Sequence, residues 1–193
     1  KSDVTFDYEK YQSDYMQSGT NYHLSGRNPG NMDKYNWKLI YNNQLTDSLK
    51  NRLTFYNGIY DNSYQYQYQY EYYGTLYTDS NWLKVKTTRL QDELTQTFGD
   101  NHTVTGGFEY SRDKVVSKGN KKLSNSAYYV QDEWNLDKRW KLTSGVRYDD
   151  SDQYGSNTSP HVNLGYKANE DTNYYASYNK YFIVPTPDQV FNN

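Results

Sequence analysis

The 193-residue sequence contains no cysteine, which excludes a disulfide framework, a thiolate metal site and a cysteine nucleophile. It also lacks a marked charge excess: 21 basic and 23 acidic residues are interspersed, so no basic face suited to a nucleic-acid backbone is indicated. Long apolar runs are absent too. The longest, Ala127–Val130 and Tyr181–Val184, fall far short of the roughly 20 residues that a transmembrane helix needs. If this chain crosses a membrane, it does so with β-strands.

Aliphatic residues are scarce and tyrosine is abundant. Hydrophobic residues make up only 34% of the chain and the mean hydropathy is −1.18, which is too little to fill a compact soluble core of this length. The 25 tyrosines bring the aromatic share to 18%, which argues against a disordered chain. Tyr, Thr, Asn, Ser and Asp favour strands and turns over helix interiors, so we expect an all-β protein.

Alternation of apolar and polar residues identifies the strands. Over residues 139–149, Trp140, Leu142, Val146 and Tyr148 share one face and polar residues the other. Between Ser80 and Phe98 the apolar residues do not keep one parity, which predicts a bulge or register change. Turn residues then divide the chain into about nine strands, near residues 3–16, 33–45, 48–61, 81–98, 102–116, 122–136, 139–151, 159–168 and 172–182.

The connections between these strands alternate in predicted length. Short turns are expected at Thr46-Asp47, Gly99–Asn101, Asp137-Lys138 and Asn169–Asp171, and long loops near 17–32, 62–80, 117–121 and 152–158. Short turns at one end and long loops at the other are typical of an outer-membrane barrel, and aromatic residues near strand ends suit its interfacial girdles. The alternative is a soluble sheet in which the same aromatics form cross-strand pairs.

A tyrosine-rich stretch, residues 64–73, alternates Tyr with Gln or Glu and is here called the Tyr-Gln segment. Phenol rings offer stacking area and a hydroxyl at small entropic cost, so the segment can present a binding surface. Our substrate-contact candidates are Tyr66, Tyr68, Tyr70 and Tyr72, or the opposite Gln set. The equally weighted alternative is a tall hairpin whose tyrosines only pair with one another.

Other chemistry finds little support in the sequence. The three histidines, His23, His102 and His161, are too scattered to predict a metal site, and Asp149, Asp150 and Asp152 lack the Gly and Glu offsets of a calcium loop. Ser124 or Ser126 with a histidine has no nucleophile-elbow signature around it. We therefore expect no catalytic residue, no metal ligand and no intrinsic cofactor.

Five short motifs, in order, resemble the barrel of TonB-dependent outer-membrane receptors. They are Ser126–Trp134, Gly145–Asp149, Ser159–Val162, Asn173–Tyr178 and Tyr181–Phe191. His161 stands where the family usually has Arg, and Ile183-Val184 stands where its Phe-Arg/Lys-Ala-Pro box has a basic residue and Ala. Phe182 and Pro185 match that box. Residues 1–125 match the family only in style.

The resemblance implies a wall of a barrel of about 22 antiparallel strands that surrounds a plug domain. No plug or TonB-contacting box is visible, so we expect residues 1–193 to be a middle portion of such a receptor. It further implies an outer-membrane location, with TonB, membrane lipid or lipopolysaccharide and a transported metal chelate as partners, and not nucleic acid. A ferric siderophore is the expected chelate, with cobalamin or haem as alternatives within the family. A tyrosine-rich adhesin or other non-transport β protein is the alternative outside it.

Overall fold

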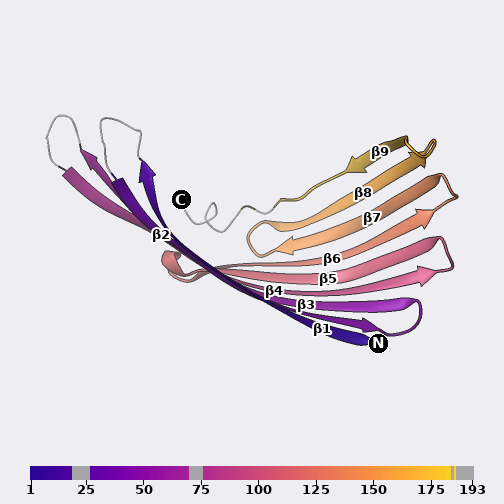
Figure 1. The fold of residues 1–193 in the computed structure, drawn as a ribbon, viewed down its shortest axis with the longest axis horizontal. Helices are drawn as coiled ribbons and strands as arrows, with labels where there is room; N and C mark the ends of the chain where they lie inside the picture. Colours follow the sequence, from indigo (N-terminus) through magenta and orange to yellow (C-terminus); the bar gives the residue numbers. More distant parts are fainter. Residues whose placement is uncertain (19–26, 70–75, 184, 186–193) are drawn as a thin grey trace.

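The computed structural model describes residues 1–18, 27–69, 76–183 and 185, except for the side chains of residues 17, 18, 27, 28, 66–69 and 76–78. These residues form one antiparallel sheet in which each strand pairs with its sequence neighbours, so the order is β1 to β9 (Figure 1). The strands are β1 (Ser2–Ser18), β2 (Arg27–Gln44), β3 (Leu49–Gln69), β4 (Leu76–Phe98), β5 (His102–Val115), β6 (Lys121–Asn135), β7 (Trp140–Ser151), β8 (Gly155–Lys167) and β9 (Asn173–Asn179). The all-β, nine-stranded prediction is confirmed.

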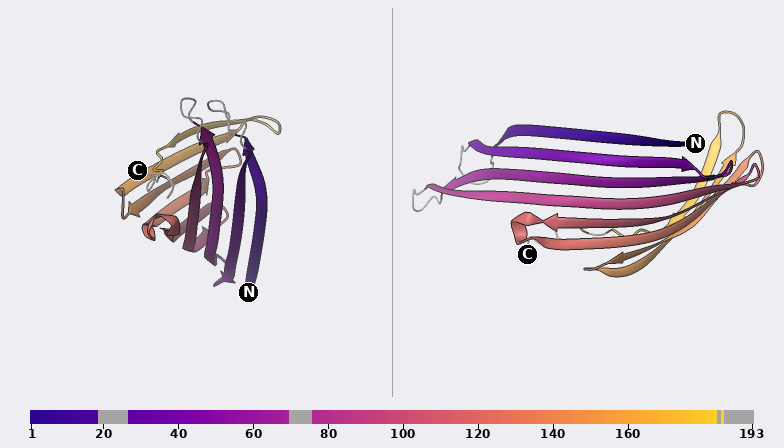
Figure 2. Two further views of the ribbon diagram at one scale, coloured as in Figure 1. Left: turned by 90° about the vertical axis from the view of Figure 1, so that its left-hand side faces the viewer. Right: turned by 90° about the horizontal axis from the view of Figure 1, so that it is seen from below.

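The sheet is open, with β1 and β9 at its edges, and it twists and curves so that β7–β9 turn away from β1 and β2 (Figure 2). The strands β1–β4 extend well beyond the others at one end (Figure 1). Among the described elements, the only helical one is a 3-10 turn, Val116–Lys118, and no helix there is long and apolar enough to cross a membrane. The architecture is a partial β-barrel wall.

All four predicted short turns lie at one end of the sheet, because they follow β2, β4, β6 and β8 in an unbroken meander. At the other end, the connection between β5 and β6, residues 116–120, has the predicted length and is shifted by one residue. The predicted loop at 152–158 is wrong, because only residues 152–154 connect β7 to β8. Most of residues 62–80 belong to β3 and β4, because the Tyr-Gln alternation continues the strand. The remaining two connections, 19–26 and 70–75, lie outside the described residues.

The expected bulge in β4 is also wrong. The register of β4 is continuous with β3 from Leu49↔Gln96 to Gln69↔Leu76, and with β5 from Val85↔Val115 to Phe98↔His102. The parity of the apolar residues changes for another reason. Leu83 and Val85 pack against the buried residues Val115 and Leu123, on the opposite face from Leu90 and Leu94. This small cluster is a buried core of the described wall.

One face of the sheet carries an apolar band, defined by the large residues that direct register places side by side. Trp140, Tyr166 and Tyr174 form one cross-strand row, and Leu142, Leu164 and Ala176 form the next. The same face continues through the rest of the sheet in Phe6, Leu39, Phe55, Leu90, Phe108, Tyr128 and Val146. Phe6 is 63% exposed and Tyr178 66%, so no part of the described chain covers this face.

The opposite face is polar. Lys141, Arg147, His161 and Asn163 all lie there, as the alternation predicts, together with Asn36, Glu93 and Glu109. Apolar residues on one face and hydrogen-bonding residues on the other are the pattern of a membrane barrel, where the first face meets lipid and the second lines the lumen. The strand register thus assigns the side chains to two faces of the sheet, which we call the lipid face and the lumen face.

Candidate functional site

Two of the four predicted substrate tyrosines lie in the described part of the chain. Tyr66 and Tyr68 lie in β3, where the backbone of Tyr66 is opposite Asp79 and that of Tyr68 is opposite Tyr77. Their side chains lie outside the described part of the structure, as do Tyr70 and Tyr72 entirely. The extended pairing agrees with a tall hairpin, and substrate contact by these four tyrosines stays a prediction.

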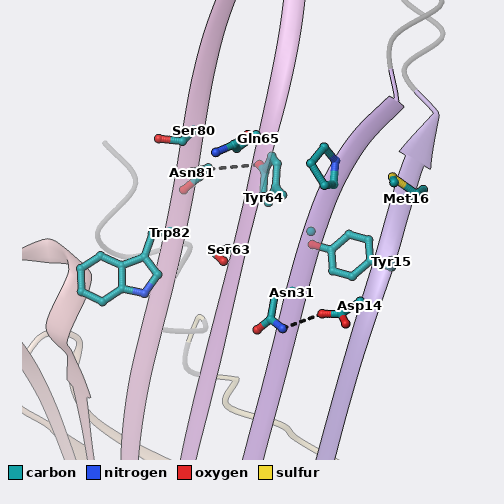
Figure 3. A pocket seen from close by; sticks show the side chains of 12 residues that line it. Asp14, Tyr15, Met16, Asn31, Ser63, Tyr64, Gln65, Ser80, Asn81 and Trp82 are labelled. Atoms are coloured by element: carbon teal, nitrogen blue, oxygen red, sulfur yellow. Dashed lines mark hydrogen bonds between the residues drawn. The ribbon is translucent and has the colours of Figure 1, made fainter.

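A pocket of about 560 Å³ lies at the base of the Tyr-Gln segment, where Tyr64 and Gln65 line it, across the extended ends of β1, β2, β3 and β4 (Figure 3). Residues from all four strands line it: Asp14, Tyr15, Met16, Pro29, Gly30, Asn31, Ser63, Tyr64, Gln65, Ser80, Asn81 and Trp82. Sequence reasoning singled out only Tyr64 and Gln65 among them, as part of the Tyr-Gln segment. The lining residues are scattered over four segments, so only the register brings them together.

Hydrogen bonds fix several of these side chains. Asn31 donates to the Asp14 carboxylate at 2.8 Å, and Asn81 donates to the Tyr64 hydroxyl at 3.1 Å (Figure 3). The Tyr15 hydroxyl donates to Asn62 at 2.9 Å, which places its ring over Gly30, where any larger residue would collide with it. The lining combines aromatic surface with amide and hydroxyl groups, and among the described residues that form it there is no Lys, Arg or His.

The indole of Trp82 is held at the edge of this pocket by a charged group. Its Nε1–H donates to Asp61 at 2.8 Å, and the same carboxylate accepts from the Lys84 ammonium at 2.7 Å. Trp82 is 47% exposed, so its ring is both oriented and accessible. An oriented indole beside amides and hydroxyls can stack on a ring-shaped solute and hydrogen-bond to its rim.

A second polar cluster lies on the lumen face of β4–β7. The Tyr129 hydroxyl donates to Glu93 at 2.8 Å and accepts from Gln91 at 3.1 Å. Arg147 donates to Asp149 at 2.8 Å and to Glu109 at 3.3 Å, and its guanidinium lies 5.9 Å from the centre of the Tyr129 ring. The cluster therefore links four strands through long side chains that lie flat over the sheet.

His161 extends this cluster to β8. Its Nε2 lies 3.1 Å from the Gln131 side-chain oxygen, and its ring covers Gly145, where an added Cβ would come within 2.5 Å of it. A shallow pocket of about 300 Å³ opens here, bordered by Tyr129, Arg147 and His161. These groups can bind polar partners inside a barrel but form no nucleophile–base pair.

The catalytic and metal alternatives fail on placement. Ser124 and Ser126 share the lipid-face parity, whereas His161 is on the lumen face, and His102 lies at the far end of β5 from both serines. Asp149 and Asp150 point to opposite faces, and the Asp152 carboxylate accepts the Ser124 backbone N–H at 3.0 Å. No group of three potential metal-ligating residues occurs within residues 1–18, 27–69, 76–183 and 185.

The two residues assigned to the family box follow the last strand. β9 ends at Asn179, and the backbone N–H of Lys180 still donates to Pro160 at 3.0 Å. Phe182 and Pro185 come after this bond and are both half-buried. They follow β9 in the order of the family motifs, and their role stays a prediction.

The family model for the TonB-dependent receptor-like β-barrel matches residues 2–193. The chain belongs to this family. TonB-dependent receptor barrels are outer-membrane proteins, and the lipid and lumen faces described above are those of their wall. The match thus includes residues 2–125, which carry none of the five motifs.

Individual relatives match only part of this chain or only part of their own length. The chain is 30% identical over 95 residues to the vitamin B12 transporter BtuB of Vibrio cholerae, which is 47% of this chain and 15% of that protein. It resembles a mutant of the ferric enterobactin receptor PfeA from Pseudomonas aeruginosa with a TM-score of 0.68 and 16% identity, over 86% of this chain and 29% of the other. It also resembles the siderophore receptor PirA from P. aeruginosa, with a TM-score of 0.53 and 19% identity, over 96% of this chain and 46% of the other. The chain thus spans less than half of the proteins it resembles.

Proposed function

We propose that this chain is a wall segment of an outer-membrane receptor that captures a scarce metal chelate outside the cell and imports it with energy supplied through TonB. The family match over residues 2–193 carries this proposal. A solute too large to diffuse through a porin must be bound tightly outside the cell, and its release inward then requires work. The barrel supplies a scaffold and ligand contacts.

The proposed substrate is a ferric siderophore. The structures most like this wall include receptors named for ferric enterobactin and for siderophores, although their low identity gives the fold alone. The chemistry of the chain itself adds support. The pocket of β1–β4 and the adjoining Tyr-Gln segment offer stacking surface and hydrogen-bonding groups, which suit an aromatic or macrocyclic chelate better than a bare ion.

Cobalamin is the second candidate, favoured by the 30% identity to vitamin B12 transporters over 95 residues. Cobalamin is also a large chelate with a macrocycle, so the same surface chemistry applies to it. A growth assay distinguishes the ferric siderophore from cobalamin as the substrate. We expect cells whose only such receptor is the full-length protein to grow on one ferric siderophore and gain nothing from added cobalamin.

The Tyr-Gln segment gives the deciding comparison. Replacing residues 64–73 with a Gly/Ser sequence of equal length is expected to abolish uptake of that chelate while the barrel still assembles. A matched variant changes only Gln65, Gln67 and Gln69 to Ala and leaves the tyrosines in place. Undiminished uptake of every chelate by the Gly/Ser variant would refute contact by the tyrosines, and uptake that persists after loss of TonB would refute the energy coupling.

A further inference from the structure

The outer part of β4 has an edge without a partner strand. β4 pairs with β5 only over Val85–Phe98, whereas its pairing with β3 continues outward as far as Leu76 (Figure 1). Within the described part of the chain, no strand therefore lies on the β5 side of residues 76–83. We call residues 76–83 the open edge. A strand edge of this length offers a row of backbone donors and acceptors to another extended chain.

Hydrogen bonds near both ends of β4 show which backbone groups face the open side. The N–H of Thr97 donates to the backbone carbonyl of Ser48 at 2.9 Å, so the odd-numbered residues of β4 direct their N–H groups toward β3. The N–H of Lys84 donates to the Ser117 hydroxyl, in the 3-10 turn, at 3.2 Å, so the even-numbered residues point the other way. Because the register is uninterrupted, the even-numbered residues of the open edge direct their backbone N–H and C=O groups away from the sheet.

The open edge is only partly protected against pairing with another chain. The Asp79 carboxylate accepts the Ser80 backbone N–H at 2.7 Å, which covers one donor with a local bond. Ser80 and Trp82 are exposed, and Figure 3 shows both on the strand at one side of the group of four. An added strand would exchange this local bond for a ladder of backbone bonds along the edge.

The tip of the β5–β6 hairpin, at the lower end of the open edge, is strongly basic. Residues 112–122 contain one acid, Asp113, and five cations: Arg112, Lys114, Lys118, Lys121 and Lys122. We call these residues the basic tip. The Asp113 carboxylate accepts the Thr87 hydroxyl at 2.5 Å on the lumen face, so it is already engaged. The basic tip therefore carries a local excess of positive charge next to the open edge.

Much of this charge has no partner carboxylate. Within the described residues, no carboxylate forms an ion pair with Lys114, Lys118 or Lys122. The neighbouring Lys84 differs, because it pairs with Asp61 at 2.7 Å. Lys114 also lies directly opposite Lys122, and like charges in such a pair destabilise a sheet. A negatively charged partner at the basic tip would relieve this repulsion.

We propose that the open edge binds an extended, acidic peptide segment of a partner protein as an added β-strand. The backbone of the peptide pairs with the even-numbered residues of the open edge, and its carboxylates neutralise the basic tip. Backbone pairing supplies affinity for any extended chain, and the charge of the basic tip selects an acidic one. The interaction goes beyond chelate import and does not depend on which chelate is imported.

A peptide meets both requirements of this surface, whereas other anions meet one. A lipid headgroup or a free anion can neutralise the basic tip, but it leaves the backbone groups of the open edge without a strand partner. A neutral or basic peptide can pair with the open edge, but it leaves the lysines without a counter-charge. The two features lie next to each other because the 3-10 turn Val116–Lys118 ends β5 at the level of Lys84.

The first test measures the binding of synthetic peptides to the purified full-length receptor in neutral detergent, by fluorescence anisotropy. The probe is a labelled peptide of about eight residues that alternates Val and Glu, which matches the length of the open edge. One control peptide replaces each Glu with Lys, and another keeps the sequence but is methylated on every backbone nitrogen. We expect the probe to bind at least tenfold more tightly than either control. Added salt should weaken its binding, since most of the basic tip is at the surface.

Variants of the receptor separate the contribution of the backbone from that of charge. Ser80→Pro removes an N–H on the open side and places a ring against the incoming strand, while the pairing with β3 is kept. It should weaken binding of the probe at least tenfold, and Ser80→Ala, which keeps the N–H, should bind as wild type does. The variant K114Q/K118Q/K122Q should also bind at least tenfold more weakly. Its matched control K50Q/K138Q/K167Q removes three exposed lysines near the short turns and should bind as wild type does.

Three results would overturn the proposal. Equal binding of the probe and its fully methylated form would show that charge alone holds the peptide. Equal binding of the Glu and Lys peptides would show that the basic tip selects nothing. Complete displacement of the probe by micelles of an anionic phospholipid would assign the basic tip to lipid instead of peptide.

A second test needs no variant and stays decisive if one of them does not fold. Amide hydrogen exchange of the wild-type full-length receptor is followed with and without a saturating concentration of the probe. Exchange should slow at least fivefold in peptic fragments that contain Ser80 and Trp82, and it should not change in fragments of β7 and β8. Unchanged exchange at the open edge with the probe bound would contradict an added strand, whatever the outcome of uptake assays.

Discussion

Gly107 lies beneath the phenol ring of Tyr129, its partner across β5 and β6. A Cβ added at Gly107 would come within 2.5 Å of the Tyr129 ring and hydroxyl and within 2.9 Å of the Asp92 backbone oxygen. The ring cannot move away freely, because its hydroxyl is bonded to Glu93 and Gln91. The glycine thus allows the lumen-face cluster to lie flat on the wall.

This geometry predicts that Gly107→Ala destabilises the assembled barrel by about 1–3 kcal/mol through overpacking. Gly106→Ala is a matched control, since its new Cβ would meet the Tyr129 backbone oxygen at an ordinary van der Waals distance of 3.6 Å. Urea midpoints of the full-length receptor folded in lipid measure both. Equal urea midpoints for the two variants would contradict the prediction that a Cβ at Gly107 collides with the Tyr129 ring.

Charge on the lipid face should be costly. Leu142 lies between the aromatic residues Trp140 and Tyr148 on the lipid face of β7, so Leu142→Arg should cost about 2–4 kcal/mol. Thr143→Arg places the same side chain on the lumen face of the next residue and should cost much less. Heat-modifiable migration on gels and urea midpoints report assembly. A cost as large for Thr143→Arg as for Leu142→Arg would contradict the assignment of the faces.

The β6–β7 turn should respond to acid through Asp137. The backbone N–H groups of Arg139, at 2.7 Å, and Trp140, at 2.8 Å, hold the pKa of its carboxyl below the ordinary value of 3.8. A lowered folded-state pKa stabilises the turn above the ordinary value, and that contribution is lost as pH falls through the lower folded value. Asp137→Asn should remove this part of the acid response. A carboxyl titration of Asp137 at or above 3.8 would contradict the turn geometry.

The sequence predicted the strands and their faces because a period of two is local information. It failed where the strands become polar, since residues 64–69 of the Tyr-Gln segment and residues 155–158 have the composition of loops but pair as strands. It also misread β4, because Leu83 and Val85 change face to reach Val115 and Leu123, which are distant in sequence. The turn-length asymmetry was therefore a weaker indication of a membrane barrel than the apolar band, in which Asp92 and Asp132 are the carboxylates between apolar neighbours.

The candidate sites were less predictable than the fold. The Tyr-Gln segment attracted notice through its composition, whereas the pocket beside it depends on register among four strands. The lumen cluster likewise joins Glu93 to Tyr129, which lie two strands apart. Isolated polar residues such as these carry no sequence signal until the pairing is known. The family motifs near the C-terminal end gave the family but not the residues that line either pocket.

The most direct test of the account is to locate each face relative to lipid. The chain has no cysteine, so Val146→Cys and Leu164→Cys on one face, and Arg147→Cys and Asn163→Cys on the other, introduce single labelling sites within it. In the full-length receptor reconstituted in bilayers, fluorophores at Val146→Cys and Leu164→Cys should be quenched by nitroxide-labelled acyl chains. Those at Arg147→Cys and Asn163→Cys should not be quenched. Equal quenching at all four positions, or quenching confined to the latter pair, would contradict the claim that this sheet is a membrane barrel wall with its apolar band facing lipid.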